Sequence, residues 1–226
     1  MIDQLEAVYR ANADSARAVA MAAYMKDKFP FFGIATPRRR ALEREVRSKG
    51  SLDEATVLAL ANGCWARSER EFQYFACDEL RRYAKQLSPD ALPAVEALIT
   101  TKSWWDTVDA LTYNVDDLVH RHPELRAVMD RWLVGDDMWL TRVAILHQMR
   151  RKEATDADWL FAACRARAHE NEFFIRKAIG WALREYSKTD AAAVTQFVAE
   201  HADVLSGLSQ REALKWLSRR AAAALS

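Results

Sequence analysis

The segment 103–109, SWWDTVD, combines two adjacent tryptophans with two aspartates. If a helix starts at Ser103, Asp106 forms a capping pair with that serine and needs no other role. Asp109 lies past the first turn, one turn after Trp105, where capping does not account for a carboxylate. An indole and a carboxylate on one face suit a cation, through cation–π attraction and through charge. Packing of Trp105 under a neighbouring helix, with Asp109 paired to a surface Lys or Arg, would explain the same residues.

A second tryptophan lies in a column of cations. In EFFIRKAIGWALREYSK, residues 172–188, Trp181 has Lys177 four positions before it, Arg184 three after and Lys188 seven after. Helical spacing puts these side chains on one face. Cations that flank an exposed indole can hold phosphates while the ring rests against a sugar or a base. We therefore expect Lys177, Arg184 and Lys188 to contact phosphates.

Arg142 interrupts a mainly apolar segment, MWLTRVAILHQM at 138–149. A semi-buried arginine needs an anion, which would be Asp109 of the preceding repeat or a phosphate. A purely structural salt bridge between repeats is the alternative.

The elements that position these residues are helices. Apolar residues recur at spacings of three and four along the chain, and only 6 Gly and 5 Pro interrupt them. Four of the starts carry capping signals, at Thr36, Ser51, Ser68 and Ser103. No linker rich in Gly, Ser or Pro divides the chain, so we expect one domain over residues 1–226. The predicted helices are 2–11, 14–28, 37–49, 52–62, 69–87, 90–100, 104–121, 124–134, 138–151, 156–168, 172–188, 191–202 and 209–224.

The predicted helices repeat. Ala76, Ala110, Ala144 and Ala178 are each 34 residues apart, and each lies inside a predicted helix. A period of this length carried by helix pairs is typical of an α-solenoid, in which small residues let neighbouring helices pack closely. The sequence therefore predicts an all-α protein, a curved stack of helical repeats whose concave face suits an extended partner.

Composition excludes several classes of protein. Lys and Arg number 33 against 32 Asp and Glu, so the net charge of +1 does not by itself indicate a polyanionic partner. We find neither a signal sequence nor an apolar run of membrane-spanning length, which predicts a cytoplasmic protein. The distant cysteines Cys64, Cys77 and Cys164 indicate buried thiols, and the scattered histidines form no metal motif. We expect no metal and no cofactor.

Several segments resemble the AlkD-type DNA alkylation-repair glycosylases over nearly the whole chain. They are KSWWDTVDAL, WLTRVAIL and FFIRKAIGWALREYSKT, with FPFFGIATPRRR near the start and LSQREALKW near the end. The resemblance implies a monomeric HEAT-like solenoid that holds duplex DNA in its concave face. It also implies hydrolysis of the N-glycosidic bond of the positively charged purines 3-methyladenine and 7-methylguanine, with the lesion still stacked. By motif, Trp105, Asp109 and Trp181 match the catalytic cleft, and Arg142 and Arg184 match cationic groups beside it.

The residue types suit that reaction. An alkylated purine that already carries a positive charge leaves without a general acid, so the enzyme has only to stabilise the sugar cation. Asp109 would do so and orient the attacking water, while Trp105 and Trp181 would favour a cationic base. The alternative is a non-catalytic repeat protein, either a binder of DNA structures or a protein scaffold. A pure DNA binder would keep Arg142 and Arg184 but would not need Asp109.

Overall fold

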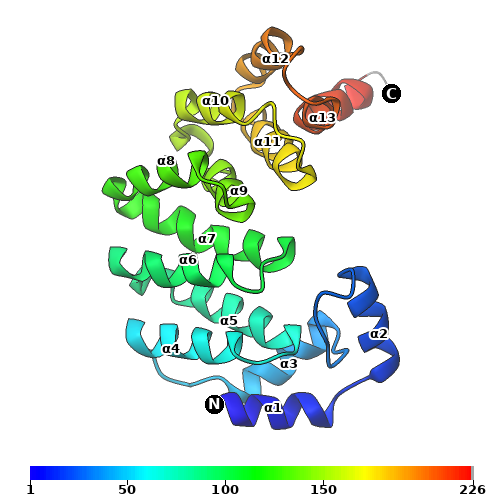
Figure 1. Ribbon diagram of the computed structural model, residues 1–226, viewed down its shortest axis with the longest axis vertical. Coiled ribbons are helices and arrows are strands. Elements are labelled where there is room, and N and C mark those ends of the chain that lie inside the picture. Colours follow the sequence, from blue (N-terminus) through cyan, green and yellow to red (C-terminus); the bar gives the residue numbers. More distant parts are fainter. Residues whose placement is uncertain (225–226) are drawn as a thin grey trace. The chain divides into compact units, whose positions relative to one another are not determined.

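The computed structural model describes residues 1–224, which form thirteen α-helices and four short 3₁₀ helices and contain no strand (Figure 1). The all-α prediction is confirmed, and each predicted helix has an observed counterpart. The α-helices are α1 (Ile2–Ala11), α2 (Ser15–Tyr24), α3 (Thr36–Val46), α4 (Glu54–Trp65), α5 (Arg70–Arg82), α6 (Leu92–Thr100), α7 (Trp105–Arg121), α8 (Arg126–Val134), α9 (Met138–Leu146), α10 (Ala157–Ala166), α11 (Phe173–Tyr186), α12 (Ala191–Glu200) and α13 (Gly207–Ala224). The 3₁₀ helices are η1 (Ala84–Gln86), η2 (Pro89–Ala91), η3 (Pro123–Leu125) and η4 (Lys152–Ala154).

The helices form two compact units, Met1–Leu118 and Val119–Ser226. The first holds α1 to α6 and most of α7, and in it α4 to α7 lie in successive layers (Figure 1). In the second, α9 packs on α11 and α11 packs on α13. A single domain over 1–226 and a concave face that binds DNA stay predictions.

The repeat is visible in the hydrogen bonds between layers, because several of them join residues that are 34 positions apart. Each links equivalent places in consecutive helix pairs, as a helical-repeat fold requires. The bonds are Tyr9 Oη to Glu43 Oε1 (2.6 Å), Ser88 Oγ to Glu54 Oε1 (2.9 Å), Asn114 Nδ2 to Leu80 O (2.8 Å) and Arg167 Nε to Leu133 O (2.6 Å).

The core is built from apolar residues at helical spacings of three and four. On α7 the side chains of Val108, Leu111, Val115 and Leu118 are fully buried, and on α11 those of Ile175, Ile179, Ala182 and Leu183 are buried too. Burial of each valine, leucine or isoleucine side chain contributes about 1.5–3 kcal/mol, which determines which face of each helix is left for other roles.

The predictions that Thr36, Ser51, Ser68 and Ser103 cap helices are wrong. Thr36 is the first residue of α3, and Ser103 lies before the start of α7 and donates to Ile99 O at 2.6 Å. Aspartates cap several helices instead, because a carboxylate accepts backbone N–H groups and also suits the positive helix start. These caps are Asp14, Asp53, Asp137, Asp156 and Asp190.

The three cysteines agree with the sequence prediction. Cys64, Cys77 and Cys164 all lie in the described part of the chain, where they are buried free thiols. Burial raises the pKa of each thiol, to about 12 for Cys64, so they remain protonated and unreactive. None of the described helices is both long and apolar enough to cross a membrane.

Candidate functional site

The first turn of α7 is fixed by a buried ion pair that the sequence did not reveal. Arg70 on α5 is fully buried, and it donates through Nε (3.0 Å) and Nη2 (2.6 Å) to the two carboxylate oxygens of Asp106. Its remaining donors reach Lys102 O at 2.9 Å and Thr107 Oγ1 at 2.8 Å. The interpretation of Asp106 as a simple capping residue with Ser103 is therefore wrong.

Two aromatic residues contact the ion pair between Arg70 and Asp106. Tyr74 Oη donates to Asp106 Oδ2 at 2.7 Å, and burial together with that carboxylate raises the pKa of the tyrosine. The Phe29 ring lies under the Arg70 guanidinium at 3.8 Å. The guanidinium and the carboxylate thus have several partners each, as buried charges require, and the start of α7 has one defined position.

Trp105, the first residue of α7, lies half-buried beside Tyr24 at the end of α2, with an edge-to-face contact of 6.2 Å between ring centroids. Tyr24 is 70% exposed, so one side of this aromatic pair faces solvent. Nothing in the spacing of the sequence singled out Tyr24, because the contact depends on how α2 packs against α7. Tyr24 also borders an apolar cavity of about 220 Å³, lined by Ala20, Met21, Tyr24, Met25, Phe31 and Tyr74.

Asp109 is half-buried one turn after Trp105 on α7. The face that it shares with Trp105 continues into Thr112 and Asp116, which are 8% and 7% exposed. This stripe is polar, and its later part is buried. A half-buried carboxylate next to a half-buried indole is able to act on a positive charge that approaches the first turns of α7.

In the second unit three cations surround Trp181 on α11. Arg142 Cζ lies 5.2 Å from the centroid of the indole, Lys177 Nζ 5.6 Å and Arg184 Cζ 5.9 Å. We call Trp181 and these three residues the Trp181 cluster. Cations at this distance from an indole make its surroundings strongly positive, which favours a negatively charged ligand such as a phosphate.

Arg142 is more deeply buried than the sequence predicts. It is 1% exposed, and its Nη1 donates to Phe174 O at 2.7 Å. Its guanidinium also lies 5.9 Å from the centroid of the Phe174 ring. This hydrogen bond links α9 to α11. It also determines on which side of the Trp181 indole the positive charge of Arg142 lies.

Sequence reasoning also missed Glu212 on α13, although it lies inside LSQREALKW. Its Oε1 accepts from Lys177 Nζ at 2.8 Å, and its Oε2 accepts from Arg184 Nη1 at 2.7 Å. The hydrogen bond from Lys177 and the nearby positive charges hold the pKa of Glu212 below its usual range, so it is a carboxylate at neutral pH.

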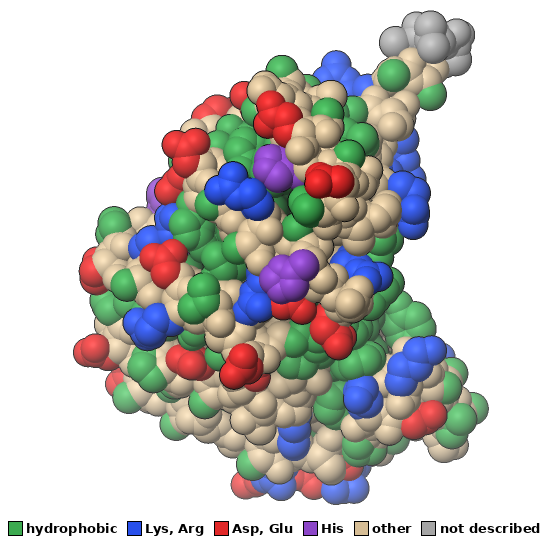
Figure 2. Space-filling view, turned by 45° about the horizontal axis from the view of Figure 1, so that its top comes forward, with side chains coloured by type: hydrophobic (Ala, Val, Ile, Leu, Met, Phe, Trp, Pro, Cys, Tyr) green, Lys and Arg blue, Asp and Glu red, His purple; other side chains and the backbone are tan. Residues whose placement is uncertain are grey.

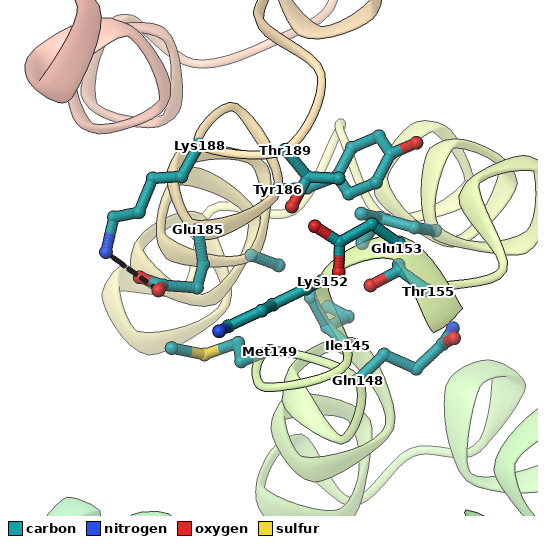
Figure 3. Close-up of a pocket in the computed structure, with 12 residues that line it drawn as sticks. Ile145, Gln148, Met149, Lys152, Glu153, Thr155, Glu185, Tyr186, Lys188 and Thr189 are labelled. Carbon is teal, nitrogen blue, oxygen red and sulfur yellow. Dashed lines mark hydrogen bonds and ion pairs between the residues drawn. The ribbon is translucent and has the colours of Figure 1, made fainter.

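Lys188, the last predicted cation of the column, lies just beyond the end of α11 and bonds to Glu185 in the last turn of that helix (Figure 3). The distances from Nζ to the two carboxylate oxygens are 2.7 and 2.6 Å. Both residues border a cavity of about 250 Å³ at the ends of α9 and α11 (Figure 3). Lys152, Glu153 and Tyr186 also line it, and Lys152 begins η4 with a φ of 49°.

Charges of both signs are mixed over the face shown in Figure 2, where Lys and Arg side chains lie between Asp and Glu side chains. This agrees with the net charge of +1. Within residues 1–224, no group of three His, Cys, Asp or Glu side chains is arranged to hold a metal ion.

Comparisons with known proteins agree on one family. A family model described as "DNA alkylation repair enzyme" matches residues 5–217. A solved structure described as a predicted DNA alkylation repair enzyme from Enterococcus faecalis is similar, with a TM-score of 0.84 and 34% identity over 91% of this chain and 96% of that chain. The structure of smu.31 from Streptococcus mutans shares the fold, with a TM-score of 0.60 and 15% identity over 76% of this chain and 88% of that one. No curated protein matches the chain.

Proposed function

Since the chain belongs to the DNA alkylation repair enzyme family, we propose that it is a DNA glycosylase that removes positively charged alkylpurines from duplex DNA. Its substrates would be 3-methyladenine and 7-methylguanine, and its product an abasic site for base excision repair. We further propose that it acts in the cytoplasm, as a monomer and without a metal or other cofactor.

The observation that carries the proposal is the pairing of Trp105 with Asp109, one turn apart on α7 and both half-buried. The ion pair between Arg70 and Asp106 holds the helix start that carries them. A site that stabilises charge must be held rigidly, because reorganisation during the reaction would cancel much of the benefit.

In the reaction the bond between C1′ of the deoxyribose and the purine nitrogen breaks, and its electron pair neutralises the cationic base. Asp109 stabilises the positive charge that develops on the sugar and accepts a hydrogen bond from the attacking water. The water oxygen bonds to C1′, and its proton passes to Asp109 or to solvent. No general acid is needed, because the leaving base is positively charged before the bond breaks.

We assign different roles to the two tryptophans. The three cations around Trp181 would repel a cationic purine, so this indole suits the sugar and its phosphates, with Lys177 and Arg184 as the phosphate ligands. Arg142 is 1% exposed, so it would attract the phosphates by its charge from behind the indole. Trp105, beside Tyr24, suits the cationic base, for which cation–π attraction is worth about 0.5–2 kcal/mol. Lys188, bound to Glu185, would add a weaker phosphate contact.

The test is the change Asp109→Asn, which removes the charge and nearly preserves the shape. Single-turnover excision of 7-methylguanine from a duplex should slow by about 10²- to 10³-fold, while binding to the same duplex persists. Asp90→Asn is the matched control, because Asp90 is exposed and lies outside the α7 helix. Equal excision rates in the two variants would remove Asp109 from the catalytic role.

A protein that binds duplex DNA but excises nothing, even as wild type, would instead be the non-catalytic DNA-structure binder. A protein that neither binds nor excises would be a scaffold. The wild-type measurement therefore decides between the alternatives before any variant is compared.

A further inference from the structure

Glu212 is an acidic residue that contacts two of the cations around Trp181. It is 8% exposed, and its two oxygens bind Lys177 Nζ at 2.8 Å and Arg184 Nη1 at 2.7 Å. Lys215 Nζ approaches the same carboxylate at 3.6 Å. A phosphate approaching Lys177 and Arg184 would therefore meet cations that already share a negative charge.

The position of this carboxylate is fixed by the packing of α13 on α11. A Cβ atom added to Gly180 would lie 2.5 Å from Glu212 Cβ and 2.9 Å from Ser209 O, so only glycine permits this approach. Ser209 Oγ also donates to Arg176 O at 3.0 Å across the same contact. The backbone and Cβ of Glu212 therefore cannot move away from Lys177 and Arg184 without separation of the two helices.

The side chains of Lys177 and Arg184 are still 22% and 26% exposed. An ammonium has three N–H groups and a guanidinium has five, so each keeps donors beyond the bond it makes to Glu212. Lys177 and Arg184 can thus bind Glu212 and a phosphate at the same time. The negative charge of Glu212 lowers their combined charge by one unit.

We propose that Glu212 is an internal anion that limits how strongly the Trp181 cluster binds DNA phosphates. By cancelling one of the two positive charges of Lys177 and Arg184, it weakens attraction to undamaged DNA, which is electrostatic. Glu212 therefore limits the affinity of the protein for DNA, and the inference rests on the proposed function.

The decisive variant is Glu212→Gln, which keeps the shape and an acceptor oxygen but removes the charge. Affinity for an undamaged duplex, measured by fluorescence anisotropy at several salt concentrations, should rise by about three- to tenfold. The slope of log K against log salt should become steeper by about one. A merely structural role predicts the opposite sign, because a disturbed contact between α11 and α13 would weaken binding.

Glu200→Gln is the matched control, because it removes the same charge from an exposed position on α12 in the same unit. An equal rise in affinity in both variants would attribute the effect to net charge and overturn the inference. The double variant Lys177→Gln with Glu212→Gln removes both members of the ion pair, so no lysine is left without its counterion. It therefore serves if the single variant Glu212→Gln fails to fold. Compared with Lys177→Gln alone, which loses one phosphate ligand, the double variant should bind an undamaged duplex about three- to tenfold more tightly.

The outcomes separate this inference from the proposed function. Wild-type protein that fails to bind duplex DNA would overturn both. Wild-type binding with unchanged or weaker affinity in Glu212→Gln would overturn the role of Glu212 alone. If that single variant unfolds, binding by the folded double variant that is no tighter than binding by Lys177→Gln overturns it, and tighter binding supports it.

Discussion

Asp106→Asn should destabilise the protein strongly, although the sequence alone suggests a mild loss of capping. Asparagine replaces one carboxylate oxygen with an NH₂ group, which would face a donor of Arg70 or of Tyr74. The guanidinium of Arg70 is fully buried and would keep its charge without a counterion.

The magnitude follows from the number and kind of bonds lost. Asp106 accepts two hydrogen bonds from a charged donor and one from a tyrosine, and its side chain is 6% exposed. Breaking a buried ion pair by changing one partner costs about 3–5 kcal/mol, and asparagine retains one acceptor, so we expect about 3 kcal/mol. For a chain of this size that corresponds to a fall in Tm of roughly 6–12 °C.

The assay is urea unfolding followed by far-UV circular dichroism, with thermal unfolding as a second measure. Asp90→Asn is again the control, and its unfolding free energy should lie within about 0.5 kcal/mol of wild type. A loss below about 1 kcal/mol for Asp106→Asn would show that the Arg70 pair does not hold the start of α7. Asp106→Asn also makes a poor control for Asp109→Asn, because it would disturb Trp105 itself.

Two further predictions concern the second unit. Arg184→Ala should weaken binding to damaged and undamaged duplex alike and make the slope of log K against log salt shallower by about one, and an unchanged slope would mean that Arg184 is structural. The buried imidazole of His147 has its pKa lowered from 6.5 to about 4 by burial. Because the unfolded chain takes up that proton at higher pH, stability should fall as the pH drops from about 6.5 to about 4, by up to about 1.4 kcal/mol per pH unit. In urea unfolding, His147→Gln should make the unfolding free energy depend less on pH between about 4 and 6.5. The same pH dependence in wild type and variant would contradict the assignment of this effect to His147.

Local sequence patterns were enough to predict the helices and the faces that they bury. Val108, Leu111, Val115 and Leu118 follow helical spacing, and the structure buries all four. This information is local, because a helix is set by residues within a few positions of one another and by the apolar stripe that they form. The 34-residue period of the alanines extends the same reasoning to the stacking of helix pairs.

The pairing of the charged side chains, by contrast, depends on how the helices pack in three dimensions. Asp106 and Asp109 have equivalent chemistry in the sequence, yet Asp106 is bound to Arg70, 36 positions earlier. Glu212 reaches Lys177 across 35 positions and Arg184 across 28. Every repeat offers several acidic and basic residues at helical spacing, so the sequence leaves many pairings open. The choice among them depends on distances of a few ångströms between helices, which are set when the layers pack.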